Sequence, residues 1–315
     1  MIPLLKKNFN HIALPALVAT LFLAQSHGAG SSAEPVEFSH DEIASSLVLI
    51  SYQVDGKNKS GNGVIIQMEG NPYLLTNLHI ILGAEKIRFT TASGERLTPR
   101  RVELSNSRDL VRLSLEDDSQ GLPFSSGAKM NTPVAIFTGG NGKEQKVEHG
   151  KIIGIGGGKL EVSAKFDDSS NGAPALNAKK EVVGITTYSR EFSQHAMKTG
   201  TRFEKNTRHF CCRVGKDDWI AVNWKTYNRK YGKEYRKHDV FCTQILGILK
   251  DRGNFNASTK RASELATECR THVRQLQLLS EQRDLTGFLL NEFEEKIELF
   301  EYAEGLFLDY VNSKR

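Results

Sequence analysis

Residues 47–188 consist of short apolar segments rich in β-branched residues, separated from one another by glycine, asparagine or aspartate. Most of these segments alternate between apolar and polar residues, which is the period of a strand with one buried face. The segments expected as strands are 47–54, 61–68, 73–76, 86–91, 97–104, 109–115, 133–138, 147–156, 159–164 and 181–188. Short strands at this spacing are typical of an all-β barrel or sandwich, so this part of the chain is predicted to be mainly β.

The pattern changes after residue 189. Two further strand-like segments, "RHFCCRV" and "WIAVNW", predict a connecting hairpin within 201–229. Beyond it, apolar residues recur at steps of three and four, which predicts two or three packed helices over 230–315 with a break at 251–257. The apolar positions that define these helices are Ala262, Leu265, Cys269, Val273, Leu276, Leu289, Phe293, Ile297, Phe300 and Phe307.

The N-terminus has the organisation of a secretory signal. Lys6 and Lys7 precede an apolar stretch, 12–24, and small residues suited to cleavage follow at Ala24-Gln25-Ser26. We therefore expect a signal peptide at 1–26, a leader at 27–44, and a mature protein that is periplasmic or secreted and has no membrane contact after the signal is removed.

All four cysteines, Cys211, Cys212, Cys242 and Cys269, lie in the C-terminal third. An oxidising compartment favours disulfides. Because bridging adjacent residues is strained, we expect Cys211 and Cys212 each to pair with one of the other two, with the choice between the two pairings open. The spacing is not that of a CxxC…CxxC zinc site, so neither a metal nor a cofactor is expected.

The charge is unevenly distributed, with a basic block at 224–239, "WKTYNRKYGKEYRKHD". Such a block could face nucleic acid or an anionic surface. A solvated helix face is the commoner explanation, and export argues against a nucleic-acid partner. No nucleic-acid binding is therefore expected.

Two segments carry residues suited to proton transfer. "YLLTNLHIILGA" places His79 directly after a predicted strand, and "SRDLVRLSL" places Asp109 at the start of another. A carboxylate that begins a buried strand needs a partner for its charge, and an imidazole would supply one. Together with "SGNGVII" (60–66), these segments resemble the "LTNxHV", "DxALL" and "GSGxII" segments of trypsin-like serine proteases, especially the HtrA-like branch. The resemblance covers roughly 45–190 and implies a double β-barrel peptidase domain, which we bound at 45–200.

The third motif departs from the family. In "SSNGAPALNAKKEVVGITT", Gly172, Pro174 and the Val-Gly-Ile of the following strand keep the register of the family's Gly-Asn-Ser-Gly-Gly-Pro motif. The resemblance therefore puts Asn171 at the position of the nucleophilic serine. It also puts Ser169, Ser170 and Asn171 in the segment that forms the oxyanion hole.

A carboxamide is a poor nucleophile, so we expect a catalytically impaired peptidase homologue, a pseudoprotease, that acts by binding a peptide or a protein. The alternative is an active serine endopeptidase in which Ser170 serves His79 and Asp109 after a one-residue slip of the loop. A third possibility is a structural protein whose groove is unused. The oligomeric state is left open.

Overall fold

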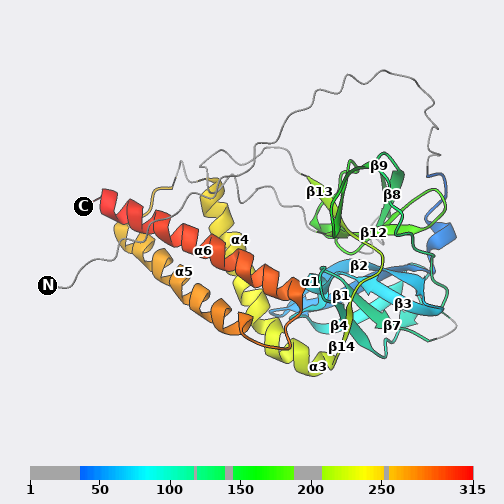
Figure 1. Cartoon of the computed structure of the whole chain (residues 1–315), viewed down its shortest axis with the longest axis horizontal. Coiled ribbons are helices and arrows are strands. Elements are labelled where there is room, and N and C mark those ends of the chain that lie inside the picture. The colour runs from blue at the N-terminus through cyan, green and yellow to red at the C-terminus, as the bar shows by residue number, and fades with distance from the viewer. Residues whose placement is uncertain (1–35, 117–118, 139–144, 188–207, 252–254, 315) are drawn as a thin grey trace, which may run out of the picture. The chain divides into compact units, whose positions relative to one another are not determined.

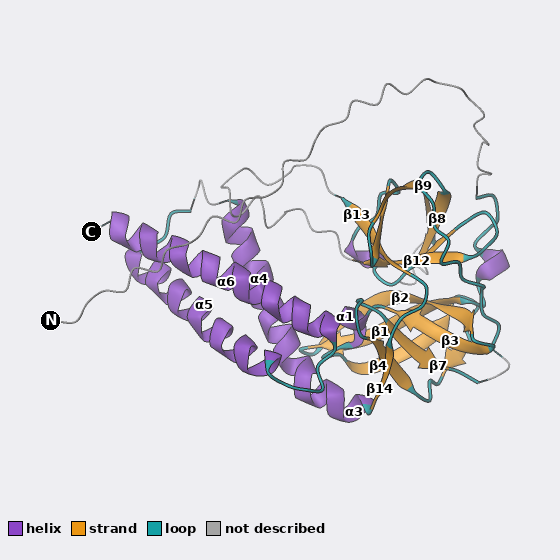
Figure 2. Cartoon of the chain, viewed as in Figure 1, coloured by secondary structure: helices purple, strands orange, loops and turns teal. Residues whose placement is uncertain are grey.

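The computed structural model describes residues 36–116, 119–138, 145–187, 208–251 and 255–314. The expected signal peptide and the first half of the expected leader fall within 1–35, outside the described residues. Strands occupy the first part of the described chain and long helices the last part, as the colouring of Figures 1 and 2 shows. The predicted mainly β fold followed by a helical region is therefore confirmed.

The first β unit is an eight-stranded sheet with the strand order β14-β6-β7-β3-β2-β1-β4-β5. Every neighbouring pair in it is antiparallel. Its strands are β1 (Leu47–Val54), β2 (Lys57–Met68), β3 (Asn71–Thr76), β4 (Glu85–Thr91), β5 (Arg96–Leu97), β6 (Val102–Ser105), β7 (Val111–Ser114) and β14 (Trp219–Val222). A short 3-10 helix, η1 (Asp41–Ile43), precedes the sheet, and a one-turn helix, α1 (Leu78–Ile81), follows β3.

The second β unit is a closed barrel with the order β10-β13-β12-β11-β8-β9. Closure leaves this sheet without an exposed edge strand. Its strands are β8 (Pro133–Thr138), β9 (Lys146–Ile155), β10 (Lys159–Val162), β11 (Pro174–Leu176), β12 (Val182–Thr187) and β13 (His209–Arg213). Between β10 and β11 the chain forms a 3-10 helix, η2 (Asp168–Ser170).

The expected connecting hairpin within 201–229 is wrong. Strand β13 pairs with β10 and β12 in the barrel, whereas β14 pairs with β6 in the first sheet. Strand β13 is part of the barrel, where Cys211 is buried in the apolar cluster inside it. Trp219 of β14 instead receives the guanidinium of Arg112, which lies on β7 of the first sheet.

The helical region contains α3 (Trp224–Tyr227), a π-helical turn η3 (Asn228–Gly232), α4 (Lys233–Lys250), α5 (Thr259–Ser280) and α6 (Gly287–Ser313). The predicted apolar stripe of α5 is buried throughout, from Ala262 to Leu276, and Leu289, Phe293, Phe300 and Phe307 are buried on α6. Side-chain caps begin both helices, since Ser258 accepts from the N–H of Arg261 and Thr286 from that of Leu289.

Three apolar clusters hold these elements together. One joins the first sheet to the helices and contains, for example, Ile50, Leu78, Tyr235 and Phe293. A second contains residues of both β units, and the third fills the barrel. Among the described helices, none combines the length and the apolarity required to cross a lipid bilayer.

Candidate functional site

His79 and Asp109 lie side by side. Nδ1 of His79 is 2.5 Å from Oδ2 of Asp109, and the backbone N–H of His79 donates to Oδ1 of Asp109 at 3.0 Å. His79 lies on α1, directly after β3, and Asp109 lies just before β7. Strands β3 and β7 are paired antiparallel, with Thr76 opposite Val111. The C-terminal end of β3 therefore lies beside the N-terminal end of β7.

Asp109 is only 3% exposed and is surrounded by donors. In addition to His79, the hydroxyl of Thr187 donates to its Oδ2 at 3.1 Å, and the side-chain amide of Asn77 donates to its backbone carbonyl at 2.9 Å. A buried carboxylate without such donors would be strongly unfavourable. The sequence pattern predicted no role for Asn77 or Thr187. Thr187 lies on β12 and reaches the site from the other β unit, which no local pattern indicates.

The loop that precedes β11 uses its own N–H groups internally. The N–H of Ser169 donates to Oδ1 of Asp167 at 2.9 Å, and the N–H of Asn171 donates to the carbonyl of Asp168 at 3.2 Å. The N–H of Ser170 donates to the carbonyl of Asp167 at 3.0 Å. Bonds to Ser169, chiefly from its hydroxyl, lower the pKa of the Asp167 carboxyl. An oxyanion hole needs unoccupied N–H groups directed at one point, and in this conformation all three candidate donors are occupied.

Asn62 of β2 holds the loop from the other side. Its backbone N–H and its side-chain amide both donate to the carbonyl of Asn171, at 2.9 and 3.1 Å, and the amide also donates to the carbonyl of Ser169 at 2.9 Å. Sequence reasoning used the "SGNGVII" segment only for the resemblance. An asparagine between two glycines inside an apolar strand was the available signal.

Gly172 permits this contact. Its φ is +85°, and a Cβ at this position would lie 1.9 Å from the carbonyl oxygen of Asn62. The preceding residue, Asn171, has a buried side-chain oxygen that makes no hydrogen bond within the described part of the chain.

Ser170, the alternative nucleophile, lies inside η2 and is 5% exposed. Its carbonyl accepts hydrogen bonds from the hydroxyl of Thr186 and from the N–H of Ala173, the latter at 2.9 Å. The backbone on both sides of Ser170 is therefore held by the loop and by β12.

The sequence itself matches a known family. The model of the trypsin-like peptidase domain matches residues 61–185, which include His79, Asp109 and Asn171. Residues 61–185 are thus similar in sequence to the trypsin-like peptidase domain.

Curated relatives of this domain are HtrA-type proteases. The serine protease Do-like HtrA of Bacillus subtilis is 26% identical over 153 residues, which cover 42% of this chain and 34% of the relative. The serine endoprotease DegS of Haemophilus influenzae is 26% identical over 159 residues, which cover 46% of each chain. The chain thus spans less than half the length of these relatives.

Solved structures resemble the chain more loosely. The tobacco etch virus protease complexed with product aligns with a TM-score of 0.45 at 15% identity, over 63% of this chain and 90% of that chain. A serine endoprotease from Yersinia pestis aligns with a TM-score of 0.41 at 18% identity, over 68% and 66%. No functional argument follows from alignments at these values.

The expected disulfides are absent: none joins the four cysteines, all of which lie in the described residues. Cys212 and Cys211 point into two different clusters of the β units, whereas Cys242 and Cys269 belong to the cluster that contains the helices. Burial raises the pKa of the Cys211 and Cys269 thiols to about 12. Thiols with so high a pKa stay protonated and unreactive near neutral pH.

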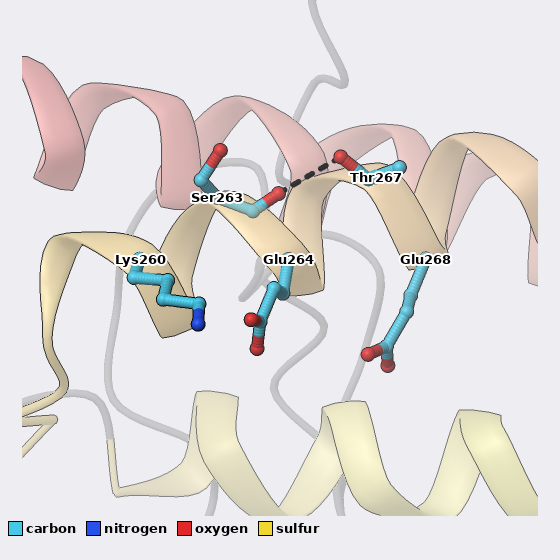
Figure 3. A pocket seen from close by; sticks show the side chains of 5 residues that line it. All are labelled: Lys260, Ser263, Glu264, Thr267 and Glu268. Carbon is cyan, nitrogen blue, oxygen red and sulfur yellow. Dashed lines mark hydrogen bonds between the residues drawn. The ribbon is translucent and has the colours of Figure 1, made fainter.

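A shallow groove lies along α5, outside the trypsin-like domain (Figure 3). Its lining residues are Lys260, Ser263, Glu264, Thr267 and Glu268. Both glutamates are within 3.4 Å of the Arg261 guanidinium, and the Thr267 hydroxyl donates to the carbonyl of Ser263 at 2.9 Å. Both glutamates and the Thr267 hydroxyl are thus engaged within the helix, and no residue of the candidate site lines the groove.

Proposed function

We propose that this protein is an exported trypsin-like peptidase homologue that binds peptide or protein segments through its peptidase domain and is impaired in hydrolysis. The observation that carries the proposal is the identity of Asn171. This carboxamide stands where the family motif has its serine, in a chain that keeps the His79–Asp109 pair at 2.5 Å.

The chemistry of a carboxamide supports impairment. An imidazole base activates a serine by taking its hydroxyl proton, whereas the Asn171 side chain has no hydroxyl and its nitrogen lone pair is delocalised. Removing the serine of such a triad lowers kcat by a factor on the order of a million.

The loop conformation supports it further. Because the N–H groups of Ser169 and Asn171 are bonded to Asp167 and Asp168, a developing oxyanion would have to displace both acceptors. Loss of a single oxyanion donor costs about a hundredfold to a thousandfold in kcat.

Hydrolysis by Ser170 is the alternative mechanism. It requires η2 to unwind so that a different residue of the loop meets the imidazole, and it requires the bonds of Ser170 to Asp167, Ala173 and Thr186 to be remade. This rearrangement makes Ser170 the weaker candidate.

An active-site serine probe separates the two mechanisms. We expect a fluorophosphonate to leave the purified full chain unlabelled and to label the Asn171→Ser variant. The matched control, Asn171→Ser combined with His79→Ala, should lose this labelling, because the base is absent. Labelling of the unaltered protein that disappears in Ser170→Ala would refute the proposal.

Binding is tested with a peptide library on the same full chain. Placing a large charged side chain in the site, as in Asn171→Arg, should weaken peptide binding at least tenfold. The control Lys260→Ala, on the α5 groove, should leave it unchanged. Peptide binding that is absent, or that is indifferent to Asn171→Arg, would favour the third possibility, in which the groove is unused.

Export is part of the proposal. It is supported by the signal-like pattern of residues 1–26 and by a relative from Hahella chejuensis named "Probable periplasmic serine endoprotease DegP-like", 28% identical over 140 residues. Recovery of the tagged protein from the periplasm or medium, with an N-terminus near residue 27, would support it. A full-length protein retained in the cytosol would contradict it.

A further inference from the structure

The turn that carries His79 is held by residues from the far end of the chain. The N–H of Gly83 donates to Oδ1 of Asn228 at 2.6 Å, and the side-chain amide of Asn228 donates to the carbonyl of Ala84 at 3.3 Å. The guanidinium of Arg236 donates to the carbonyl of Ile80 at 2.9 Å. Thus η3 and α4 bond to the main chain immediately after His79.

The two backbones also touch directly. A Cβ at Gly83, whose φ is +74°, would lie 2.4 Å from the carbonyl oxygen of Gly232, and a Cβ at Gly232 would lie 2.6 Å from the nitrogen of Gly83. Only glycines permit this approach. The π-helical turn at 228–232 brings Asn228 and Gly232 to the same contact, and such turns occur often at functional sites.

The helices contact the Asp109 segment as well. Asn106, three residues before Asp109, accepts the first N–H groups of α6: its Oδ1 accepts from Gly287 at 2.8 Å, and its carbonyl accepts from Phe288 at 2.6 Å. The hydroxyl of Tyr231 on η3 donates to Asp284, in the loop before α6, at 2.5 Å.

These hydrogen bonds connect the His79 segment to the Asp109 segment through η3 and the start of α6. The connection runs from His79 to Gly83 and Asn228, through η3 to Asp284 and the start of α6, and back through Asn106 to Asp109. Both segments of the His79–Asp109 pair are therefore fixed to the same helical layer, α3 to α6. The helical layer thus bonds to the chain on both sides of the pair.

We propose that the helical layer is a positioning element of the site, in which Asn228, Arg236 and Asn106 set the geometry of His79 against Asp109. It deepens the proposed function, because a ligand that moves this layer would change the site. It requires only that the pair contributes to the site, whether the site binds peptide or cleaves it.

The test uses Asn228→Ala and Arg236→Met in the full chain, with Arg236→Lys as the conservative variant. The first readout is the low-field proton resonance of the short His79 Nδ1–Asp109 hydrogen bond. The second is hydrogen exchange at the His79 amide, which donates to Oδ1 of Asp109. We expect Asn228→Ala and Arg236→Met to abolish or broaden the resonance and to accelerate the exchange about tenfold, and Arg236→Lys to restore part of both.

Two control variants separate positioning from general destabilisation. Val273→Ala removes buried atoms from α5, and Arg261→Ala removes a surface ion pair on the same helix. Both should leave the resonance and the exchange unchanged under conditions where the protein is folded. The inference is overturned if folded Asn228→Ala and Arg236→Met match the unaltered protein, or if Val273→Ala changes both readouts equally. Neither readout involves a peptide, so failure to bind one would refute the proposed function and leave this inference standing.

Discussion

Replacing Gly172 by alanine tests whether the loop before β11 has the conformation described here. The substitution adds two costs. A side chain at a φ of +85° is strained, which costs about 1–2 kcal/mol. The new Cβ would also lie 1.9 Å from the Asn62 carbonyl oxygen, so the loop must move away from β2. Overpacking of this kind costs about 1–3 kcal/mol.

Moving the loop has a further consequence, because Asn62 bonds to the carbonyls of Ser169 and Asn171 would lengthen. Each such bond contributes about 1 kcal/mol. The first two costs sum to about 2–5 kcal/mol. The weakened bonds place the expected loss in the free energy of unfolding for Gly172→Ala in the upper part of this range, about 3–5 kcal/mol.

Two other glycines isolate the individual costs. Gly70 has a φ of +81° and nothing within 4 Å of a Cβ, so Gly70→Ala should lose only the backbone cost of about 1–2 kcal/mol. Gly157 has neither a positive φ nor a neighbour within 4 Å, so Gly157→Ala should change stability by less than about 0.5 kcal/mol.

The assay is urea unfolding at equilibrium, with the slope of the transition checked for each variant. The expected order of destabilisation is Gly172→Ala, then Gly70→Ala, then Gly157→Ala. If Gly172→Ala costs no more than Gly70→Ala, the close contact between Asn62 and the loop is wrong. The loop would then also lack the conformation in which the N–H groups of residues 169–171 are bonded internally.

Three more outcomes are expected. Asp109→Asn weakens the hydrogen bonds that a buried carboxyl receives and should lower the free energy of unfolding, measured in urea, by about 1–3 kcal/mol. The control Asp309→Asn, at an exposed position, should have almost no effect. Iodoacetamide at pH 8 should modify neither Cys211 nor Cys269 in the native protein, since burial raises both thiol pKa values to about 12. Mass spectrometry after denaturation should find four free thiols, and a native disulfide would contradict this. Burial lowers the pKa of His238 from 6.5 to about 3, so its neutral form favours folding above pH 6.5, and the melting temperature should fall as the pH drops from 6.5 towards 3, less steeply in His238→Gln.

Much of the strand pattern could be predicted because each strand is a local feature. Alternation of apolar and polar residues defines a buried face within one segment, whatever that segment pairs with. The helical stripes from Ala262 to Leu276 and from Leu289 to Phe307 were predictable for the same reason. Pairing between segments is not local, which is why the hairpin was wrongly predicted: β13 and β14 look like neighbours in the sequence but complete different sheets.

The cysteines illustrate the same limit. Their number and the expected compartment favoured disulfides, but a disulfide needs Cβ atoms about 3.5–4.5 Å apart. That distance depends on the packing of helices against strands. Cys211 and Cys212 alternate across one strand and so face different clusters, neither of which contains the helical cysteines.

By itself the sequence predicted a trypsin-like fold for the β region, the residues expected at its three motif positions, and Asn171 at the position expected for the serine. These predictions depend only on the types of residues and on their order along the chain, and the sequence contains both. Only the tertiary structure decided that His79 and Asp109 meet, that Asn62 bonds to the carbonyls of Ser169 and Asn171, and that η3 and α6 bond to both segments of the pair. These hydrogen bonds join residues that are 30 to 181 positions apart, so they depend on chain folding, and no local pattern specifies their partners.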